Sequence, residues 1–537
     1  MFFGGAMRSA TKDKEYKSPI RKLARFFEKS RDRWKAKCRE AKRMIRLLKN
    51  RIRFLEKSRH HWRQRAKEMK QKLTEAEARE RELKGELEAL KEESSKAADS
   101  DGPADFAVVP RRHQYSVGHV KLFVDLVLSD GASLRCAERA IERMIASMQL
   151  TMHSPSWYAG RLWILRLGYY KLTRPKERGD DWVWIVDHTV QIGAEKCLVI
   201  LGIRLSALPA VGECLSHEDV EPIALLPVNK SNGDVVHQQL ETGIEKTGIP
   251  REIVSDHGTD LKSGIDKFCQ EHQETCVVYD IKHKTAVLLK HELDDDPIWN
   301  EFARLAGQTK RKTQQTPLAP LSPPNQRTKA RYMNVDILIH WGQDTLAFLD
   351  RAEENTMFDA EQVEEKLGWI IRFRQPLKEW EALLQVVVTT ESYVRQRGLY
   401  QDIHLELEQR LRPLALTEQA RRACTELTAF VAQEAAKARP GERLLGSSEI
   451  IESVLGKLKR LEQDQSKSGF TGLLLALCAT VATTTTDIIH QALETVPTSA
   501  IIAWCRKNLG LSVQAKRRRA FASQKVEQKR NQSWSLA

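Results

Sequence analysis

The segment Asp-Trp-Val-Trp-Ile-Val-Asp-His-Thr, residues 181–189, determines the fold that we expect for this chain. The apolar run at 182–186, which includes β-branched residues, predicts a strand buried on both faces of a sheet and ending at Asp187. A second short strand, Glu-Ile-Val-Ser at 252–255, leads in the same way into Asp256. Each aspartate alone is explained equally well as a turn or capping residue. Two strand-end carboxylates in one fold favour a site that holds divalent cations.

The positive charge of the chain is concentrated at its N-terminus. Residues 1–72 contain 26 Lys and Arg against 7 Asp and Glu, a local charge of +19 in a chain of 537 residues whose total is +15. A second basic cluster, Lys-Arg-Arg-Arg, lies at 516–519. Concentrated positive charge is typical of nucleic-acid-binding proteins. A solvated charged helix is the alternative explanation.

Cysteine usage and hydropathy indicate a cytoplasmic protein. The 9 cysteines are scattered without a Cys-x-x-Cys pair, which argues against a disulfide framework and against a zinc finger. The N-terminus lacks the apolar core of a signal peptide. The longest apolar run, residues 473–481, is too short to span a bilayer, so we expect no membrane contact.

A heptad pattern over residues 20–93 predicts a coiled coil or a long helical hairpin. Apolar residues recur every seven positions from Phe27 to Leu90, and a second, interrupted series runs beside them. Such a seam requires a partner helix, so we expect a homodimer or higher oligomer formed through a second copy of the chain. The basic flanks are equally suited to lie along DNA phosphates. Residues 94–112, rich in Ser, Ala, Asp and Gly, are expected to be a linker.

Three helical segments are expected within residues 113–175. The first covers 117–128, a Ser-Asp-Gly turn leads to a second that ends near 148, and a third follows Ser-Pro-Ser at 154–156. This order fits a helix-turn-helix DNA reader, and an ordinary three-helix bundle fits it as well. The position of the segment in a basic chain, ahead of an acidic site, favours the DNA-binding interpretation.

Residues 181–283 alternate as three strands, a helix, a strand, a helix and a strand. This order, with acids after the first and fourth strands, resembles the ribonuclease H-like core of DDE transposases and retroviral integrases. The His257-Gly258 step after Asp256 is similar to the Asp-Asn-Gly step of integrases, and a glycine lets the chain turn sharply there. The resemblance extends over residues 112–465 in scattered motifs and points to bacterial insertion-sequence transposases. It implies a mixed α+β protein whose α/β core is interrupted by an all-helical insertion, in a nucleoid-associated location.

The ribonuclease H-like core that this chain resembles has a third carboxylate on a helix beside the first and fourth strands. Two glutamates are candidates for this role. The spacing of Glu292 after Asp256 matches compact integrases. Glu452 lies much later, but Ile-Ile-Glu-Ser followed by Gly-x-Lys-x-Lys resembles the acidic helix of integrases. Lys457 and Lys459 of this motif are suited to hold the DNA backbone. We therefore expect Glu452 to be the third acid, with Glu292 as the runner-up.

A further motif supports the later glutamate. Asp280-Ile-Lys-His283 is similar to the Cys/Asp-x-x-His signature of hAT-like transposases, in which a long helical insertion precedes the acidic helix. The resemblance assigns residues 284–446 to the insertion, 447–512 to completion of the core, and 513–537 to a basic tail. Asp280 and His283 are then expected to position the insertion or a flanking nucleotide.

The expected chemistry follows from the carboxylates. Asp187, Asp256 and Glu452 would hold two Mg²⁺ or Mn²⁺ ions that clamp the attacking and leaving oxygens of a phosphoryl transfer. Water would free a 3′-OH at the element end, and this hydroxyl would attack double-stranded target DNA. His188 and His257 are expected to hold the acids in place rather than to orient waters or phosphates themselves. Two alternatives stay open: a non-catalytic DNA-binding or architectural protein with a degenerate fold, and a nuclease without strand transfer.

Overall fold

The computed structural model describes residues 106–149, 152–190, 195–325, 332, 335–351, 357–463, 470–511 and 513–521, with parts of the segment 19–44 and residue 67. The chain divides into two units, Met1–Asp101 and Gly102–Ala537. In the first unit residues 24–35 are helical. Most of the expected coiled coil lies outside the described residues, so its pairing with a second copy stays a prediction.

The second unit contains one mixed sheet of five strands. The strands are β1 (Trp182–Val190), β2 (Lys196–Arg204), β3 (Glu221–Val228), β4 (Glu252–Ser255) and β5 (Cys276–Tyr279), in the spatial order β3-β2-β1-β4-β5. The pairs β1–β2 and β2–β3 are antiparallel, whereas β1–β4 and β4–β5 are parallel. This topology is consistent with the expected ribonuclease H-like core, and with its many helices the chain is a mixed α+β protein.

The first strand is longer than the sequence indicated. It does not end at Asp187 but continues to Val190, because residues 187–190 stay paired with β2. Its neighbour on the other side, β4, ends at Ser255. Asp187 therefore lies within a strand that has lost one of its two partners at this point.

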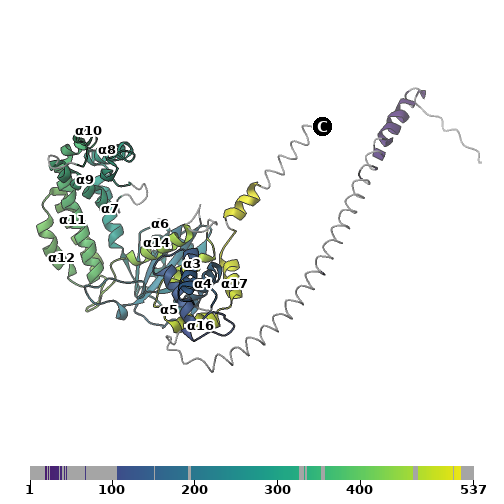
Figure 1. The fold of residues 1–537 in the computed structure, drawn as a ribbon, viewed down its shortest axis with the longest axis horizontal. Helices are drawn as coiled ribbons and strands as arrows, with labels where there is room; N and C mark the ends of the chain where they lie inside the picture. The colour runs from purple at the N-terminus through teal and green to yellow at the C-terminus, as the bar shows by residue number, and fades with distance from the viewer. Residues whose placement is uncertain are drawn as a thin grey trace, which may run out of the picture. The chain divides into compact units, whose positions relative to one another are not determined.

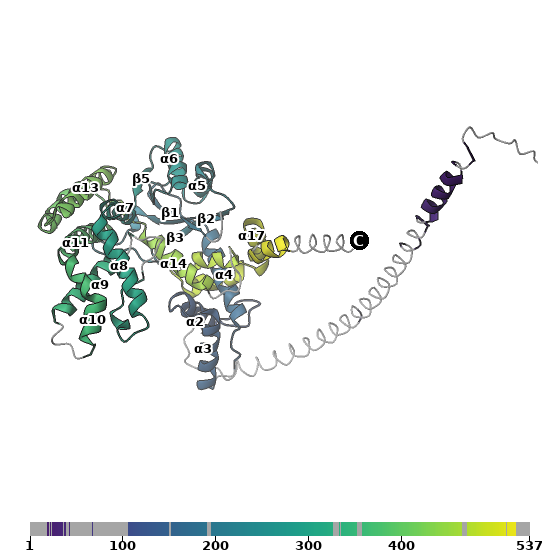
Figure 2. The same cartoon turned by 90° about the horizontal axis from the view of Figure 1, so that it is seen from above.

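Helices cover both faces of the sheet (Figure 2). On one face α5 (Gly233–Thr247) and α6 (Thr259–Glu271) pack against Trp184 and Val186. On the other, α4 (Trp157–Thr173), α14 (Glu449–Gln463) and α15 (Leu475–Ala479) share a core with Val183 and Ile185. Because successive strand residues point to opposite faces, Asp187 follows Val183 and Ile185 toward the α14 face.

A group of helices interrupts the core between β5 and α14 and lies to one side of the sheet (Figure 1). They are α7 (Ile281–Leu293), α8 (Pro297–Thr313), α9 (Val335–Asp350), α10 (Ala360–Leu367), α11 (Arg374–Arg397), α12 (Ile403–Leu411) and α13 (Glu418–Ala435). Their centre is aromatic, with the Phe302 ring centroid 5.2 Å from that of Trp380 and 5.3 Å from that of Phe373. The helical insertion thus has buried side chains of its own and is more than a long loop.

The return segment, residues 442–448, brings the chain from this helical group back to the sheet. Arg251, just before β4, makes a two-pronged ion pair with Glu442, at 2.9 Å and 2.7 Å. The buried Glu252 accepts a hydrogen bond from the backbone N–H of Leu445 at 2.9 Å. At the far end of the segment, Ile281 N–H donates to the carbonyl of Gly446 at 3.1 Å. The insertion therefore begins and ends at the same place on the sheet.

The helices expected within residues 113–175 are present as α2 (Val117–Leu128), α3 (Leu134–Ser147) and α4. Helix α4 approaches α15 so closely that a Cβ at Gly168 would collide with the backbone of Leu475. The buried Lys171 of α4 donates to the carbonyls of Val481 and Ala482 at 2.7 Å and 2.8 Å. These helices therefore belong to the same compact unit as the sheet, and their role in reading DNA stays a prediction.

Two further helices, α16 (Thr486–Thr495) and α17 (Thr498–Asn508), complete the C-terminal part of this unit, and residues 513–521 are also helical. In the part of the chain that the structure describes, no helix is both long enough and apolar enough to cross a membrane.

Candidate metal centre

The pairing of β1 with β4 sets the positions of the two aspartates. The parallel register pairs Ile185 with Val254 and Val186 with Ser255. Asp187 and Asp256 are the next residues of the two chains, so they leave the paired region side by side, at a strand spacing of about 4.8 Å. Val254 belongs to the same core as Ile185. The alternation of side chains therefore directs Asp256 toward the α14 face, as it does Asp187.

The electrostatics of Asp187 agree with this arrangement. Burial raises the pKa of Asp187 to about 7, and the nearby charges of Asp256 and Glu452 act in the same direction. A hydrogen bond from the backbone N–H of His188, at 2.6 Å, opposes the rise in pKa. A half-buried carboxylate with two acidic neighbours lies in a region of negative potential that attracts cations. Such a group is suited to a site for a divalent metal ion.

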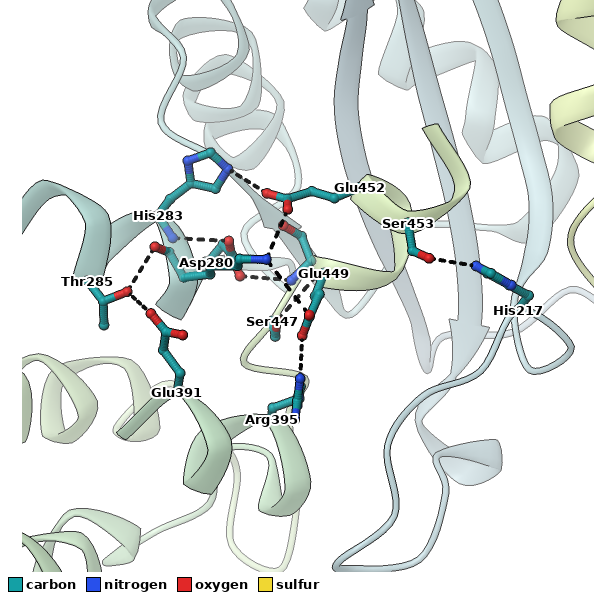
Figure 3. Close-up of polar contacts among 12 residues, drawn as sticks. His217, Asp280, His283, Thr285, Glu391, Arg395, Ser447, Glu449, Glu452 and Ser453 are labelled. Atoms are coloured by element: carbon teal, nitrogen blue, oxygen red, sulfur yellow. Dashed lines mark hydrogen bonds and ion pairs between the residues drawn. The ribbon is translucent and has the colours of Figure 1, made fainter. Parts of the chain in front are cut away.

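Glu452 reaches this region from the first turn of α14. The helix buries Ile451, Val454 and Leu455, and Glu452 lies at the margin of that apolar face. Its carboxylate lies 3.3 Å from His283 Nε2 and 3.3 Å from Lys282 Nζ (Figure 3). Burial raises the pKa of Glu452, but these two partners outweigh burial, and the pKa lies below its ordinary value.

His283 shows the reciprocal effect. Burial lowers its pKa, but the hydrogen bond to Glu452 and the charges of Asp280 and Asp256 raise it above the ordinary value. The ring is therefore surrounded by carboxylates from β4, from the end of β5 and from α14. The protonated ring is therefore stabilised by both Glu452 and Asp256.

Asp280 holds the two ends of the helical insertion together. Its Oδ2 accepts from the backbone N–H of His283 at 3.2 Å, which caps the N-terminus of α7. Its Oδ1 accepts from the backbone N–H of Ser448 at 2.9 Å, 168 positions later in the chain. Burial raises the pKa of Asp280, and the Ser448 N–H opposes the rise. The main effect of Asp280 is thus to fix the start of α14 beside the start of α7 (Figure 3).

Two groups of side chains among the described residues bring three donor atoms within 4.8 Å of one another: Asp280, His283 and Glu452, and separately His237, Glu241 and Glu271. The expected triad of Asp187, Asp256 and Glu452 is not as tight. Like charges repel, and Glu452 is held by His283 and Lys282 on the side of α7. The carboxylates of the triad are close enough to shift the pKa of Asp187, but their donor atoms do not converge on one point.

The two histidines that follow the aspartates do not point at them. His188 follows strand alternation to the opposite face, where its Nδ1 lies 3.6 Å from Asp260 of α6. Burial lowers the pKa of His188 to about 4. His257 is exposed and stacks on Tyr279, with ring centroids 3.8 Å apart. Neither ring therefore points into the group of Asp187, Asp256 and Glu452, here called the acidic centre, and the supporting role expected for the two histidines stays a prediction.

The basic residues of α14 lie on different sides of that helix. Lys459 is exposed and seven positions after Glu452, which places it two turns further along the same face. Lys457 is half-buried and faces another direction. Arg460 is exposed beside Lys459.

Glu292 lies at the far end of α7. Its carboxylate pairs with Arg422 Nη2 of α13 at 2.6 Å. Twelve positions separate it from Asp280, which corresponds to about 18 Å along a helix. The structure thus places Glu292 apart from Asp187 and Asp256 and places Glu452 near them.

Several residues that shape this centre were not singled out from the sequence. Lys282 holds Glu452 from within the Asp-x-x-His motif itself. Arg251, Glu252 and Glu442 hold the return segment. The sequence did carry a signal for two of these residues: charged side chains at 251 and 252 stand at the start of a strand that is otherwise apolar.

No protein-family model and no curated protein matches this chain. Among solved structures, the chain is similar to the Drosophila P element transposase strand transfer complex, with a TM-score of 0.34 and 12% sequence identity over 75% of this chain and 98% of that chain. A likeness this weak supports no inference about function.

Proposed function

We propose that this chain is a DDE-type DNA transposase, which cuts DNA at the ends of a mobile element and joins those ends to target DNA in a metal-dependent reaction. One observation carries the proposal: the parallel register of β1 and β4 sets Asp187 and Asp256 side by side on the face toward which α14 brings Glu452.

The donor set fits magnesium. Asp187, Asp256 and Glu452 offer only carboxylate oxygens, the ligands that Mg²⁺ and Mn²⁺ prefer. Two such ions, when bound by these residues, supply the charge that stabilises the attacking and leaving oxygens of an in-line displacement. Asp187 must lose its proton to become a ligand, and its pKa near 7 allows this at neutral pH.

The surrounding residues position the carboxylates. His283 and Lys282 hold the side chain of Glu452, and Asp280 fixes the start of its helix to the start of α7. These contacts make the third acid dependent on the return segment. Asp280 and His283 therefore have a positioning role in this proposal.

DNA would approach along the exposed face of α14. Beyond Glu452 this face is open at Gly456, where an added Cβ would meet no atom within 4 Å. Lys459 lies about 10 Å beyond Glu452 on the same face, the length of about three nucleotides of one DNA strand. Its charge suits a backbone phosphate near the one that reacts. The basic segment 1–72 and the expected coiled coil would add non-specific DNA affinity and a second copy of the chain.

The experiment that tests the proposal separates metal binding from cutting. Purified full-length protein would be loaded with Fe²⁺ and treated with ascorbate and peroxide, which cleaves the backbone next to a bound metal. Cleavage is expected near residues 187, 256, 280 and 452 and is expected to be suppressed by excess Mg²⁺. In parallel, a supercoiled plasmid carrying the DNA that flanks the gene should be nicked only with Mg²⁺ or Mn²⁺.

Each alternative predicts a different result. DNA binding without metal-directed cleavage or nicking would indicate a non-catalytic DNA-binding protein. Nicking that never joins a labelled 3′ end to a second DNA would indicate a nuclease without strand transfer.

A further inference from the structure

Helices α5 and α6 pack together on the sheet face opposite α14, and the middle of α5 and the C-terminal end of α6 bring two histidines and two glutamates together. His237 and Glu241 are four positions apart on α5, so they share one side of that helix. Glu271 is the last residue of α6, and His272 is its C-cap. From this cluster we infer that His237, Glu241, Glu271 and His272 bind one Zn²⁺ ion, which ties α5 to α6.

Donor atoms of His237, Glu241 and Glu271 already lie within 4.8 Å of one another, and His272 contacts this group through Glu241. His237 Nε2 lies 3.4 Å from a carboxylate oxygen of Glu271 and 3.7 Å from one of Glu241. His272 Nε2 lies 2.9 Å from the same oxygen of Glu241. In a tetrahedral zinc site with ligands at about 2.0–2.1 Å, neighbouring donor atoms are about 3.3 Å apart. The donors of His237, Glu241 and Glu271 approach that geometry, whereas His272 lies outside their group and would complete the site by turning its ring toward it.

The lack of a hydrogen bond at the buried Nε2 of His237 favours a bound metal ion. Its Nε2 is sealed from solvent and makes no hydrogen bond, although it lies between two carboxylates. A buried polar atom without a hydrogen bond has a cost in free energy, and coordination of a cation would remove this cost. The His272 ring is held by Phe268, with ring centroids 4.5 Å apart. The second imidazole therefore lies beside the group of His237, Glu241 and Glu271 before a metal binds.

The donor chemistry selects zinc over the ions of the acidic centre. Two imidazole nitrogens with two carboxylates suit Zn²⁺, whereas Mg²⁺ prefers oxygen ligands alone. With four protein ligands the site has no open position, so we assign it a structural role. The inference is independent of the transposase proposal, because the site lies on the other face of the sheet.

The test measures zinc binding by the full-length protein after removal of metals with a chelator. Zn²⁺ is titrated in competition with a chromogenic chelator, with Mg²⁺ in excess to occupy the acidic centre. We expect one tight site, and we expect Co²⁺ in its place to show the intense visible absorption of a four-coordinate ion. Loss of a residue that only supports a ligand already costs about 10–100-fold in affinity. His237→Ala and His272→Ala should therefore each weaken zinc binding by at least about 100-fold.

A matched control is present in the chain. His490 and Glu494 form an i,i+4 pair at 3.5 Å on α16, but no second helix adds donors among the described residues. His490→Ala should bind zinc as the wild type does. Glu241→Gln, which keeps the shape of the side chain, should weaken binding even if an alanine variant fails to fold.

Three outcomes would overturn the inference: no tight zinc site in the wild type, unchanged affinity in His237→Ala and Glu241→Gln, or loss of the site in His283→Ala instead. The last result would assign the zinc to the group of Asp280, His283 and Glu452.

Discussion

Replacing Glu452 with Gln tests the choice of the third acid, with Glu292→Gln as its matched control. Both changes remove one negative charge and keep the size of the side chain. Glu452 interacts with His283 and Lys282 near the two aspartates, whereas Glu292 pairs with Arg422 at the far end of α7. The two variants therefore differ mainly in their distance from Asp187 and Asp256.

The expected effect of Glu452→Gln is large on catalysis and small on stability. A pair of metal ions contributes several kcal/mol of transition-state stabilisation, and loss of one ligand should reduce the nicking rate by about 10³-fold or more, equivalent to roughly 4 kcal/mol. The Glu452 side chain is 29% exposed, and partly exposed ion pairs contribute about 1 kcal/mol or less to folding. Glu292→Gln should lose a similar amount of stability and retain its nicking rate.

The assay uses the plasmid that carries the flanking DNA, purified variants and added Mn²⁺, with gel shift to measure DNA binding and thermal unfolding to measure stability. DNA affinity should not fall in Glu452→Gln, because the change removes negative charge near the phosphates. Full nicking by Glu452→Gln would refute its role as a metal ligand. A dead Glu292→Gln variant beside an active Glu452→Gln variant would exchange the two assignments.

Other predictions follow from buried charges. Asp187 has a pKa near 7 in the folded protein against about 3.9 unfolded. Between these pH values the native state therefore binds more protons than the unfolded state. The contribution of Asp187 to the free energy of unfolding falls as the pH rises through this range. In a chelator, Asp187→Asn should gain in melting temperature over the wild type as pH is raised from about 4 to 7; an equal difference at both pH values would contradict this. Arg251→Met should lower the free energy of unfolding by about 1–3 kcal/mol, because the half-buried Glu442 loses its cationic partner and keeps only the backbone N–H of Arg439, and the double variant with Glu442→Leu should recover part of this loss in chemical denaturation. Lys171→Met should cost at least about 2 kcal/mol, because several backbone carbonyls lose their donor; an unchanged denaturation midpoint would show that these carbonyls are satisfied otherwise.

The sequence by itself was sufficient to predict the strands of the sheet and to identify the aspartates that follow the apolar runs of two of them, whereas their role as metal ligands stays a prediction. A buried strand is a local pattern of apolar residues, and 182–186 and 252–255 carry it without help from the rest of the chain. The five-stranded mixed sheet agrees with the order of elements expected from residues 181–283. Alternation along a strand would also have shown that His188 and Asp187 point to opposite faces, as the structure has them.

Tertiary structure decided how far β1 extends and where Glu452 lies. Residues 187–190 carry a weak local strand signal, and pairing with β2 keeps them in the sheet. Helix α14 reaches the sheet because Arg251 pairs with Glu442, Glu252 binds Leu445 N–H and Asp280 binds Ser448 N–H. These contacts join residues up to 193 positions apart. No local pattern encodes such pairs, because each is stabilised only when burial removes water from two distant polar groups at once.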